Sequence, residues 1–201
     1  MRFQRYEWSC GAAASVNALK HFGIHVQERN VIPVAGTTAP SKCKHCNDVD
    51  YLIDNRTCRK TSFWKCSCEQ CLVIKREWRK DCSAGTTENG ILSTMKHFGT
   101  GKGVSATEYE SESKNDAWQW LHGSLLHGRV VILCVDSWGH WVLAFGSAGD
   151  RVSVFDSYPS KKNLKEHGVI TMTKPELMRR WWNGRKWVGK GKRLYAISAG
   201  K

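Results

Sequence analysis

The chain has 201 residues and is 41% hydrophobic, which is enough for a folded core and excludes a wholly disordered protein. It has no run of about 18 apolar residues and no apolar signal core at its N-terminus, which excludes a transmembrane helix and a secreted product. The formal net charge is +13 and is uneven, with 12 Lys or Arg against two Glu in residues 161–201. The composition predicts a cytoplasmic protein with no membrane contact, or one released by lysis.

The first predicted element is a helix from Cys10 to about His21, with Gly23 placed to end it. Its first residue lies where free backbone N–H groups and the helix dipole favour a thiolate, the nucleophilic form of cysteine. Gln4 lies six residues upstream, where its amide could donate to an oxyanion that forms beside the sulfur. Residues 31–40 are then predicted to form a short extended piece and a loop.

Residues 41–84 are rich in Cys, Lys and Arg and lack the periodic apolar pattern of a core element. Seven of the nine cysteines lie between Cys43 and Cys82, and in a reducing cytoplasm such clustered thiols favour metal binding over disulfides. Two C-x2-C pairs separated by 21 residues are typical of a tetrahedral zinc site, formed by Cys43, Cys46, Cys68 and Cys71. We expect this zinc to be structural, because four thiolates leave no open position for water.

Other side chains of this segment could extend the metal site, namely Cys58, Cys66, Cys82 and His45. Seven thiols and one imidazole are enough ligands for two zinc ions, so the expected content is one or two Zn²⁺. The segment cannot bury enough apolar surface to fold alone. Residues 41–84 are therefore predicted to be a zinc-binding insertion in a single domain formed by residues 1–40 and 85–201.

The chain after the insertion begins with two predicted helices. Thr87 or Thr86 could cap the first helix. Its apolar face carries Ile91, Leu92, Met95 and Phe98. A second, shorter helix is predicted from Asp116 to about Leu126.

Three strand-like runs follow at residues 129–135, 140–145 and 151–155, joined by turns that suit antiparallel pairing. A further helix begins near Lys174, where Pro175 fits the first turn, and residues 193–198 form a plausible final strand. Helices followed by a mostly antiparallel sheet predict the α+β class.

Two polar residues of these strands could complete a catalytic group with Cys10. His140 opens one predicted strand directly after a glycine turn, and Asp156 ends the next strand. Adjacent antiparallel strands could place them side by side, so that Asp156 fixes the tautomer of a His140 base. Five further histidines lie on predicted helices or loops with no matching acid: His21, His25, His97, His122 and His127. Cys134 lies inside an apolar strand and is predicted to be an inert core residue.

The chain resembles the C39 peptidases and their C39-like relatives within the papain-like group. The resemblance covers about 160 of the 201 residues, all but the Cys-rich insertion. The matching stretches are Gln4-x5-Cys10-Gly11 with its Ala-rich helix, Gly85-Thr86-Thr87-x2-Gly90, His140-Trp141-Val142, the strand ending at Asp156, and Trp-x-Gly-Arg-x-Trp before the last strand.

The resemblance implies a papain-like fold, with the nucleophile helix packed on a mostly antiparallel sheet. It also implies peptide-bond hydrolysis by a Cys–His–Asp triad and a Gln oxyanion donor, which are here Cys10, His140, Asp156 and Gln4. The expected partner is a peptide or protein substrate.

Two departures from the family pattern limit what the resemblance implies. The family acid is usually followed at once by Pro, whereas Pro159 comes three residues after Asp156. Bacteriocin-exporting members join the domain to a transporter that this chain lacks, so cleavage after a double-glycine leader is not implied.

The stretch His140-Trp141-x-Leu143 with Asp156-Ser157 also resembles adenoviral proteases and proteases of ubiquitin-like modifiers. Those place Gln and Cys after the acid, so the order here favours C39, while an isopeptide substrate stays open.

Two other functions remain open from the sequence. In the first, a zinc ribbon and the basic, Trp-containing C-terminal region at residues 179–187 would bind nucleic acid or an assembly, on a scaffold whose triad is inactive or used once. The compact format would suit a phage or viral product, which would be virion-associated. In the second, a transferase would use the same triad to pass the acyl group to an amine or thiol.

Overall fold

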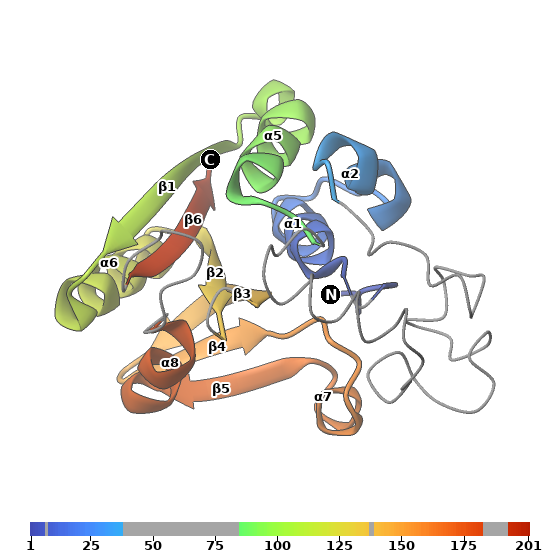
Figure 1. The fold of residues 1–201 in the computed structure, drawn as a ribbon. Helices are drawn as coiled ribbons and strands as arrows, with labels where there is room; N and C mark the ends of the chain where they lie inside the picture. The colour runs from blue at the N-terminus through green and yellow to red at the C-terminus, as the bar shows by residue number, and fades with distance from the viewer. Residues whose placement is uncertain (7, 38–84, 137–138, 183–192) are drawn as a thin grey trace, which may run out of the picture.

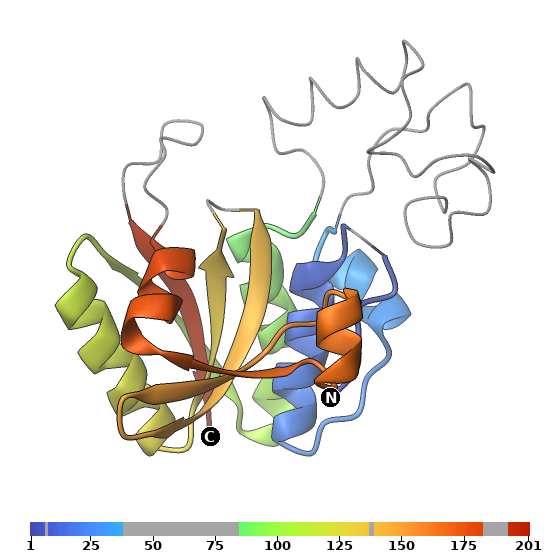
Figure 2. The same ribbon diagram turned by 90° about the horizontal axis from the view of Figure 1, so that it is seen from below.

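The computed structural model describes residues 1–6, 8–37, 85–136, 139–182 and 193–201. The predicted zinc-binding insertion, with Cys43, Cys46, Cys68 and Cys71, lies outside these residues. The described part folds around a six-stranded sheet with helices on both faces (Figures 1 and 2). The predicted α+β class with an antiparallel sheet is confirmed.

The sheet has the strand order β1-β6-β2-β3-β4-β5, and each pair of neighbours is antiparallel. The strands are β1 (Ser105–Ser111), β2 (Val130–Val135), β3 (His140–Ala148), β4 (Arg151–Phe155), β5 (Val169–Thr173) and β6 (Leu194–Gly200). The helices are α1 (Cys10–His21), α2 (Glu28–Val34), α5 (Glu88–Gly99), α6 (Lys114–Leu126), α7 (Lys161–Lys165) and α8 (Lys174–Trp181), with a 3-10 turn η1 at Thr100–Lys102.

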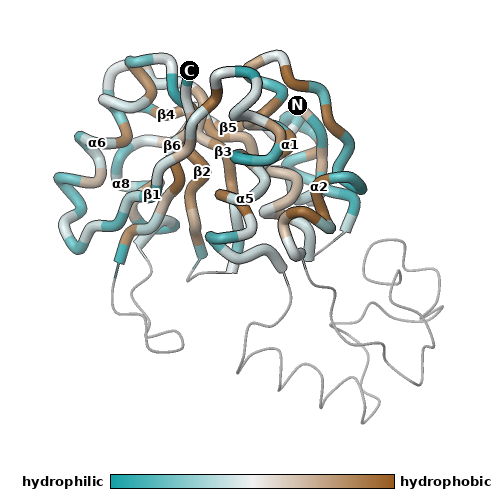
Figure 3. Tube along the Cα trace, turned by 90° about the horizontal axis from the view of Figure 1, so that it is seen from above, coloured by the Kyte–Doolittle hydropathy of each residue, from teal (hydrophilic) through white to brown (hydrophobic). Residues whose placement is uncertain are grey.

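Strand β2 shows why the centre of the sheet is apolar on both sides. Its residues alternate between two cores, because successive side chains of a strand point to opposite faces. Val130, Ile132 and Cys134 pack in the core shared with α1 and α5, whereas Val131, Leu133 and Val135 pack in the core shared with α6 and α8. Helices cover both faces, so the strand is a continuous apolar run, and the hydropathy colouring shows this in Figure 3.

Helix α1 packs against β2 and β3, and α5 lies beside it on the same face of the sheet (Figure 1). The predicted bounds of α1 are confirmed, and Gly23 follows it with a φ of 78°, as expected for a glycine that ends a helix. Thr87 is the N-cap of α5, and its side chain accepts a hydrogen bond from the Gly90 N–H.

The extended conformation predicted for residues 31–40 is wrong over residues 31–34, which belong to α2. Val31 is fully buried in a small cluster with Ala12 and Val16 of α1. Pro33 is tolerated because α2 ends one residue later, so few helical bonds are lost. Packing against α1 therefore outweighs the weak helical signal of this segment.

Strands β1 and β5, the two edges of the sheet, and helix α7 were not predicted from the sequence. The residues of β1 are half-buried or exposed, so they lack an alternating apolar pattern. Strand β5 and helix α7 have only five residues each. Among the described helices, none is long and apolar enough to cross a membrane.

Candidate active site

Cys10 is the first residue of α1, and only 7% of its surface is exposed. The first turn of α1 carries no acidic residue that would repel an anion. The last turn carries Lys20 and His21, whose basic side chains complement the negative end of the helix dipole. The first N–H groups of a helix have no intrahelical partner. The start of α1 therefore offers a favourable environment for a negative charge on sulfur or oxygen.

Gly11 allows Thr86 and Trp141 to pack closely against the start of helix α1, next to Cys10. A Cβ at this position would lie 2.5 Å from the Thr86 Cβ and 3.0 Å from Trp141. The Thr86 carbonyl accepts a 2.9 Å hydrogen bond from the Trp141 indole, and its hydroxyl pairs with Thr37. The Gly85-Thr86-Thr87 stretch thus packs between helix α1 and strand β3.

His140 and Asp156 meet at the end of the sheet beside α1. The distance between His140 Nε2 and Asp156 Oδ1 is 2.8 Å. His140 also lies close enough to Cys10 for the thiol to raise the His140 pKa. Since Nε2 is used by Asp156, the ring nitrogen left for the sulfur is Nδ1. The structure therefore brings Cys10, His140 and Asp156 together in one line of contacts.

The charges of this group stabilise one another. Burial alone would lower the pKa of His140, but the hydrogen bonds to Asp156 and Cys10 outweigh it and raise the pKa to about 10. Burial alone would raise the pKa of Asp156, but His140, the Tyr158 N–H and Arg180 lower it to about 2. At neutral pH the site therefore holds an imidazolium beside a carboxylate.

Gln4 is buried and held on two sides. Its Oε1 accepts a 2.9 Å hydrogen bond from the Ser157 hydroxyl, and its Nε2 donates to the Tyr6 carbonyl at 2.8 Å. Its backbone N–H also donates to the Ser157 carbonyl at 3.0 Å. Ser157 is the residue that directly follows Asp156, so the segment that carries the acid also holds the predicted oxyanion donor.

The segment between Gln4 and Cys10 contacts a half-buried carboxyl group of α2. Glu28 accepts hydrogen bonds from the Arg5 N–H and the Ser9 hydroxyl, and Ser9 also contacts the Tyr6 carbonyl. Burial raises the pKa of Glu28 despite these hydrogen bonds. The Tyr6 carbonyl therefore contacts both the side-chain amide of Gln4 and the hydroxyl of Ser9, the residue before Cys10.

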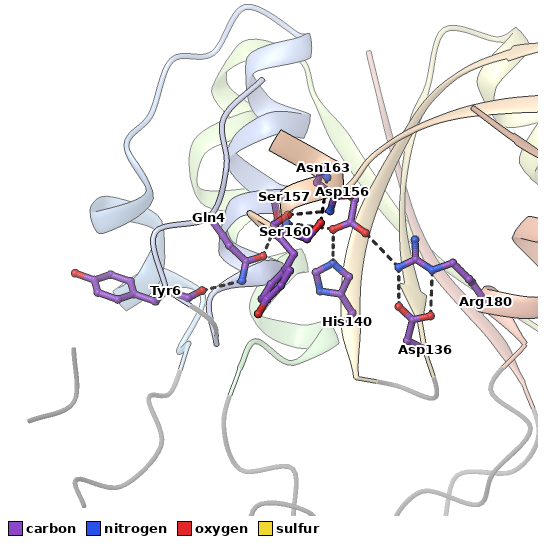
Figure 4. A network of polar contacts seen from close by, with 10 residues as sticks. Gln4, Tyr6, Asp136, His140, Asp156, Ser157, Ser160, Asn163 and Arg180 are labelled. Carbon is purple, nitrogen blue, oxygen red and sulfur yellow. Dashed lines mark hydrogen bonds and ion pairs between the residues drawn. The ribbon is translucent and has the colours of Figure 1, made fainter. Parts of the chain in front are cut away.

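The segment after Asp156 is braced from two directions. The Asp156 N–H donates to the Gly168 carbonyl at 2.9 Å, and its Oδ1 accepts from the Tyr158 N–H at 3.1 Å. The Asn163 amide of α7 donates to the Tyr158 carbonyl at 2.8 Å. Figure 4 shows these groups as one network that reaches from Tyr6 to Asp136.

Arg180, which the sequence placed only in a basic region, contacts the acid directly. Its Nη2 lies 3.2 Å from Asp156 Oδ2, and its guanidinium also pairs with Asp136. No local signal separates it from Arg179, which is exposed. Ser157 was missed as a support of Gln4 for a similar reason, because its partner lies 153 residues away in the sequence.

The remaining candidate residues are accounted for as follows. Cys134 is buried in the core. Trp181 of the basic region is 0% exposed and donates to the Tyr195 carbonyl, so it is not available for stacking on a base. In the described ranges, no cluster of three His, Cys, Asp or Glu could hold a metal ion.

No family model and no curated protein matches the sequence. Solved structures do match the fold. The peptidase domain of Streptococcus ComA, a bi-functional ABC transporter of a quorum-sensing pathway, has a TM-score of 0.52 and 15% identity, with 100% of this chain and 97% of that chain covered.

A double glycine motif protease from an AMS/PCAT transporter, solved in complex with its leader peptide, has a TM-score of 0.50 and 14% identity, with coverage of 98% and 86%. A C39-like peptidase from Bacillus anthracis has a TM-score of 0.50 and 12% identity, with coverage of 100% and 91%. The chain therefore has the fold of C39 peptidase domains, as the sequence predicted.

Proposed function

We propose that this protein is a C39-like cysteine peptidase that hydrolyses a peptide bond with Cys10, His140 and Asp156. One observation carries the proposal: His140 contacts both Asp156 and a cysteine at the start of a helix. The fold shared with C39 peptidase domains supports the same reaction class. Fold likeness alone does not assign an activity, so the arrangement of these side chains is the main support.

In the proposed reaction, the Cys10 thiolate attacks the carbonyl carbon of the scissile bond, and the carbonyl oxygen becomes an oxyanion. The protonated His140 stabilises the thiolate before the attack. The Cys10 backbone N–H and the Gln4 amide would donate to the oxyanion. Gln4 suits this role because it is buried and held on two sides, so little reorganisation is needed.

Collapse of the tetrahedral intermediate breaks the C–N bond, and His140 gives its proton to the leaving amine. The neutral His140 then removes a proton from water, and the hydroxide attacks the thioester. Release of the carboxylic acid returns the sulfur as a thiolate and leaves the proton on His140. Throughout this cycle Asp156 keeps Nε2 occupied, which presents Nδ1 to the sulfur and the water.

The proposed substrate is a peptide or an unfolded segment of a protein. One structural neighbour is bound to a leader peptide, which supports an extended substrate of this class for the fold. An isopeptide bond is attacked by the same chemistry, and an amine or thiol acceptor in place of water would make the protein a transferase. Product analysis separates these outcomes, because hydrolysis releases a free carboxylate and transfer does not.

We also propose that Cys43, Cys46, Cys68 and Cys71 hold a structural Zn²⁺. The support is the chemistry of the donor set, two C-x2-C pairs with the separation found in tetrahedral zinc sites. Bound zinc would supply folding free energy to residues 41–84 and takes no part in the reaction.

The proposal is tested by incubating the purified full-length protein with a library of short peptides of known sequence. Mass spectrometry of the products then identifies any cleaved bond. We expect cleavage by the wild-type protein and none by Cys10→Ala or His140→Ala. Cleavage that survives both substitutions, or a wild-type protein whose Cys10 is neither acylated by peptide thioesters nor alkylated at pH 6, would overturn the proposal.

A further inference from the structure

Arg180 occupies a junction between three parts of the fold. It lies in the last turn of α8, and its guanidinium reaches the end of β2 at Asp136 and the end of β4 at Asp156. Figure 4 shows Arg180 between the two carboxylates, with His140 on the far side of Asp156. Arg180 is half-buried, whereas Arg179, the preceding residue, is exposed.

The contact with Asp136 holds a residue whose backbone is left-handed. Asp136 has a φ of 55°, in the left-handed region that is unfavourable for residues other than Gly, Asn and Asp. The Asp136 N–H donates to the Arg180 carbonyl at 2.8 Å. Its carboxylate accepts from Arg180 Nε at 3.1 Å and from Nη2 at 2.6 Å.

Asp136 precedes the β2–β3 turn, and His140 is the first residue after it. Three hydrogen bonds therefore connect α8 to one end of the turn that presents His140.

The second contact of Arg180 is with Asp156 itself. Asp156 Oδ1 accepts from His140, and Oδ2 lies 3.2 Å from Arg180 Nη2, so the two oxygens have different cationic partners. The remaining polar neighbour is the Tyr158 N–H, which also donates to Oδ1. A carboxylate held at both oxygens cannot rotate away from the imidazole without losing an ion pair.

We propose that Arg180 is a positioning residue of the active site, which orients Asp156 toward His140 and fixes the turn that presents His140. The inference rests on the proposed peptidase reaction for its catalytic meaning, but the contacts themselves are independent of the substrate. Arg180 touches neither the nucleophile nor a reacting atom, so its effect passes through Asp156 and Asp136. The guanidinium gives more than a charge, because Nε and Nη2 both bind Asp136 while Nη2 also contacts Asp156, a fixed geometry that a lysine ammonium does not provide.

The test compares Arg180→Gln, Arg180→Lys and the matched control Arg179→Gln in the full-length protein. Two readouts are measured: the midpoint of the Asp156 carboxyl titration by ¹³C NMR, assigned with Asp156→Asn, and the rate of Cys10 alkylation at pH 6. Arg180→Gln should raise the midpoint by about one pH unit, because a nearby cation is lost. It should also slow alkylation by about tenfold, because the base is no longer aligned.

Arg180→Lys keeps the charge but not the fork, so the midpoint should stay near that of the wild type while alkylation slows by about threefold. Arg179→Gln should change neither readout. A folded Arg180→Gln protein with the wild-type midpoint would overturn the proposal. If Arg180→Gln does not fold, Arg180→Lys decides, because an unchanged alkylation rate then overturns the proposal and a slower rate supports it.

The two proposals fail separately. If the wild-type protein cleaves no peptide but Arg180→Gln still raises the Asp156 titration midpoint, the proposed reaction is rejected. Arg180 then remains the residue that orients Asp156. If the protein cleaves peptides but Arg180→Gln leaves the Asp156 titration midpoint unchanged, the proposed reaction stands and the positioning role of Arg180 is rejected.

Discussion

The hydroxyl of Ser157 donates a 2.9 Å hydrogen bond to Oε1 of Gln4, across 153 residues of sequence. An amide oxygen can only accept and an amide nitrogen can only donate, so this bond determines which way the Gln4 side chain is turned. Nε2 faces away from Ser157, on the side where it donates to the Tyr6 carbonyl. The residue after the acid therefore sets the orientation of the proposed oxyanion donor.

Replacing Ser157 by Ala should lower kcat by about tenfold with little change in KM, because Gln4 stabilises only the transition state. Gln4→Ala should cost about 10²-fold or more, since it removes the donor itself. The double variant should be no slower than Gln4→Ala, because Ser157 acts through Gln4. Additive losses in this cycle would show that Ser157 has a separate role.

Replacing His140 by Gln should slow the alkylation of Cys10 by iodoacetamide, and the loss should be largest near pH 6. His140, with a pKa of about 10, stays protonated well above this pH and can pair with a thiolate. The rates of the two proteins are compared from about pH 6 to 9. The measurement is mass-spectrometric mapping of the modified cysteine, and identical pH profiles for both proteins would exclude the ion pair.

Asp156 should make the protein lose stability in acid. Its pKa is about 2 in the folded protein against an ordinary value of 3.8, so its contribution to stability is present above 3.8 and is lost as the pH falls toward 2. Urea unfolding between pH 5 and pH 2 should show a steeper fall in unfolding free energy for the wild type than for Asp156→Asn. Asp150→Asn, a change in an exposed turn, should follow the wild type.

Gly11→Ala should destabilise the protein by about 1–3 kcal/mol, because the new methyl group would lie 2.5 Å from the Thr86 Cβ. Gly123→Ala is the matched control, since Gly123 lies in helix α6 with no atom within 4 Å of the added Cβ. That change should stabilise the protein by about 0.5–1 kcal/mol through helix propensity. Thermal or urea unfolding of both variants measures the contrast, and equal effects would contradict the close packing of Gly11 on Thr86.

Purified protein should contain one or two equivalents of zinc by elemental analysis. Substitution of Cys43 or Cys68 by Ser should lower this content and make residues 41–84 more sensitive to limited proteolysis, because metal binding and folding are coupled. The triad should keep its reactivity toward iodoacetamide in these variants, as the zinc is structural. Zinc-free wild-type protein that resists proteolysis would argue against the metal.

Elements with a clear local pattern were predictable from the sequence. Helices α1 and α5 and strands β2, β3 and β4 have apolar periodicity or caps that act locally. The edge strands β1 and β5 were not predictable, because they are exposed and their pairing with β6 and β4 is decided by distant residues. Helix α2 was missed because packing on α1, and not propensity, stabilises it.

The candidate site divides in the same way. Cys10, His140 and Asp156 could be proposed from residue type and order, since a cysteine peptidase needs a nucleophile, a base and a group that orients the base. Arg180 and Ser157 could not, because their roles depend on which distant residue each one touches. An Arg in a basic stretch and a Ser in a turn have no local signature.

Strand β6 lies inside the sheet between β1 and β2, yet it comes from residues 194–200 and pairs with residues 105–111 and 130–134. Its alternating side chains contribute to both cores. During folding the meander β2–β3–β4 can form from nearby residues, but the sheet stays split between β1 and β2 until this segment inserts. Long loops must close before those contacts form, so β6 insertion should be a slow step in folding. Until β6 inserts, the edges of β1 and β2 that face it stay unpaired, which makes aggregation of newly made chains the main competitor of correct assembly.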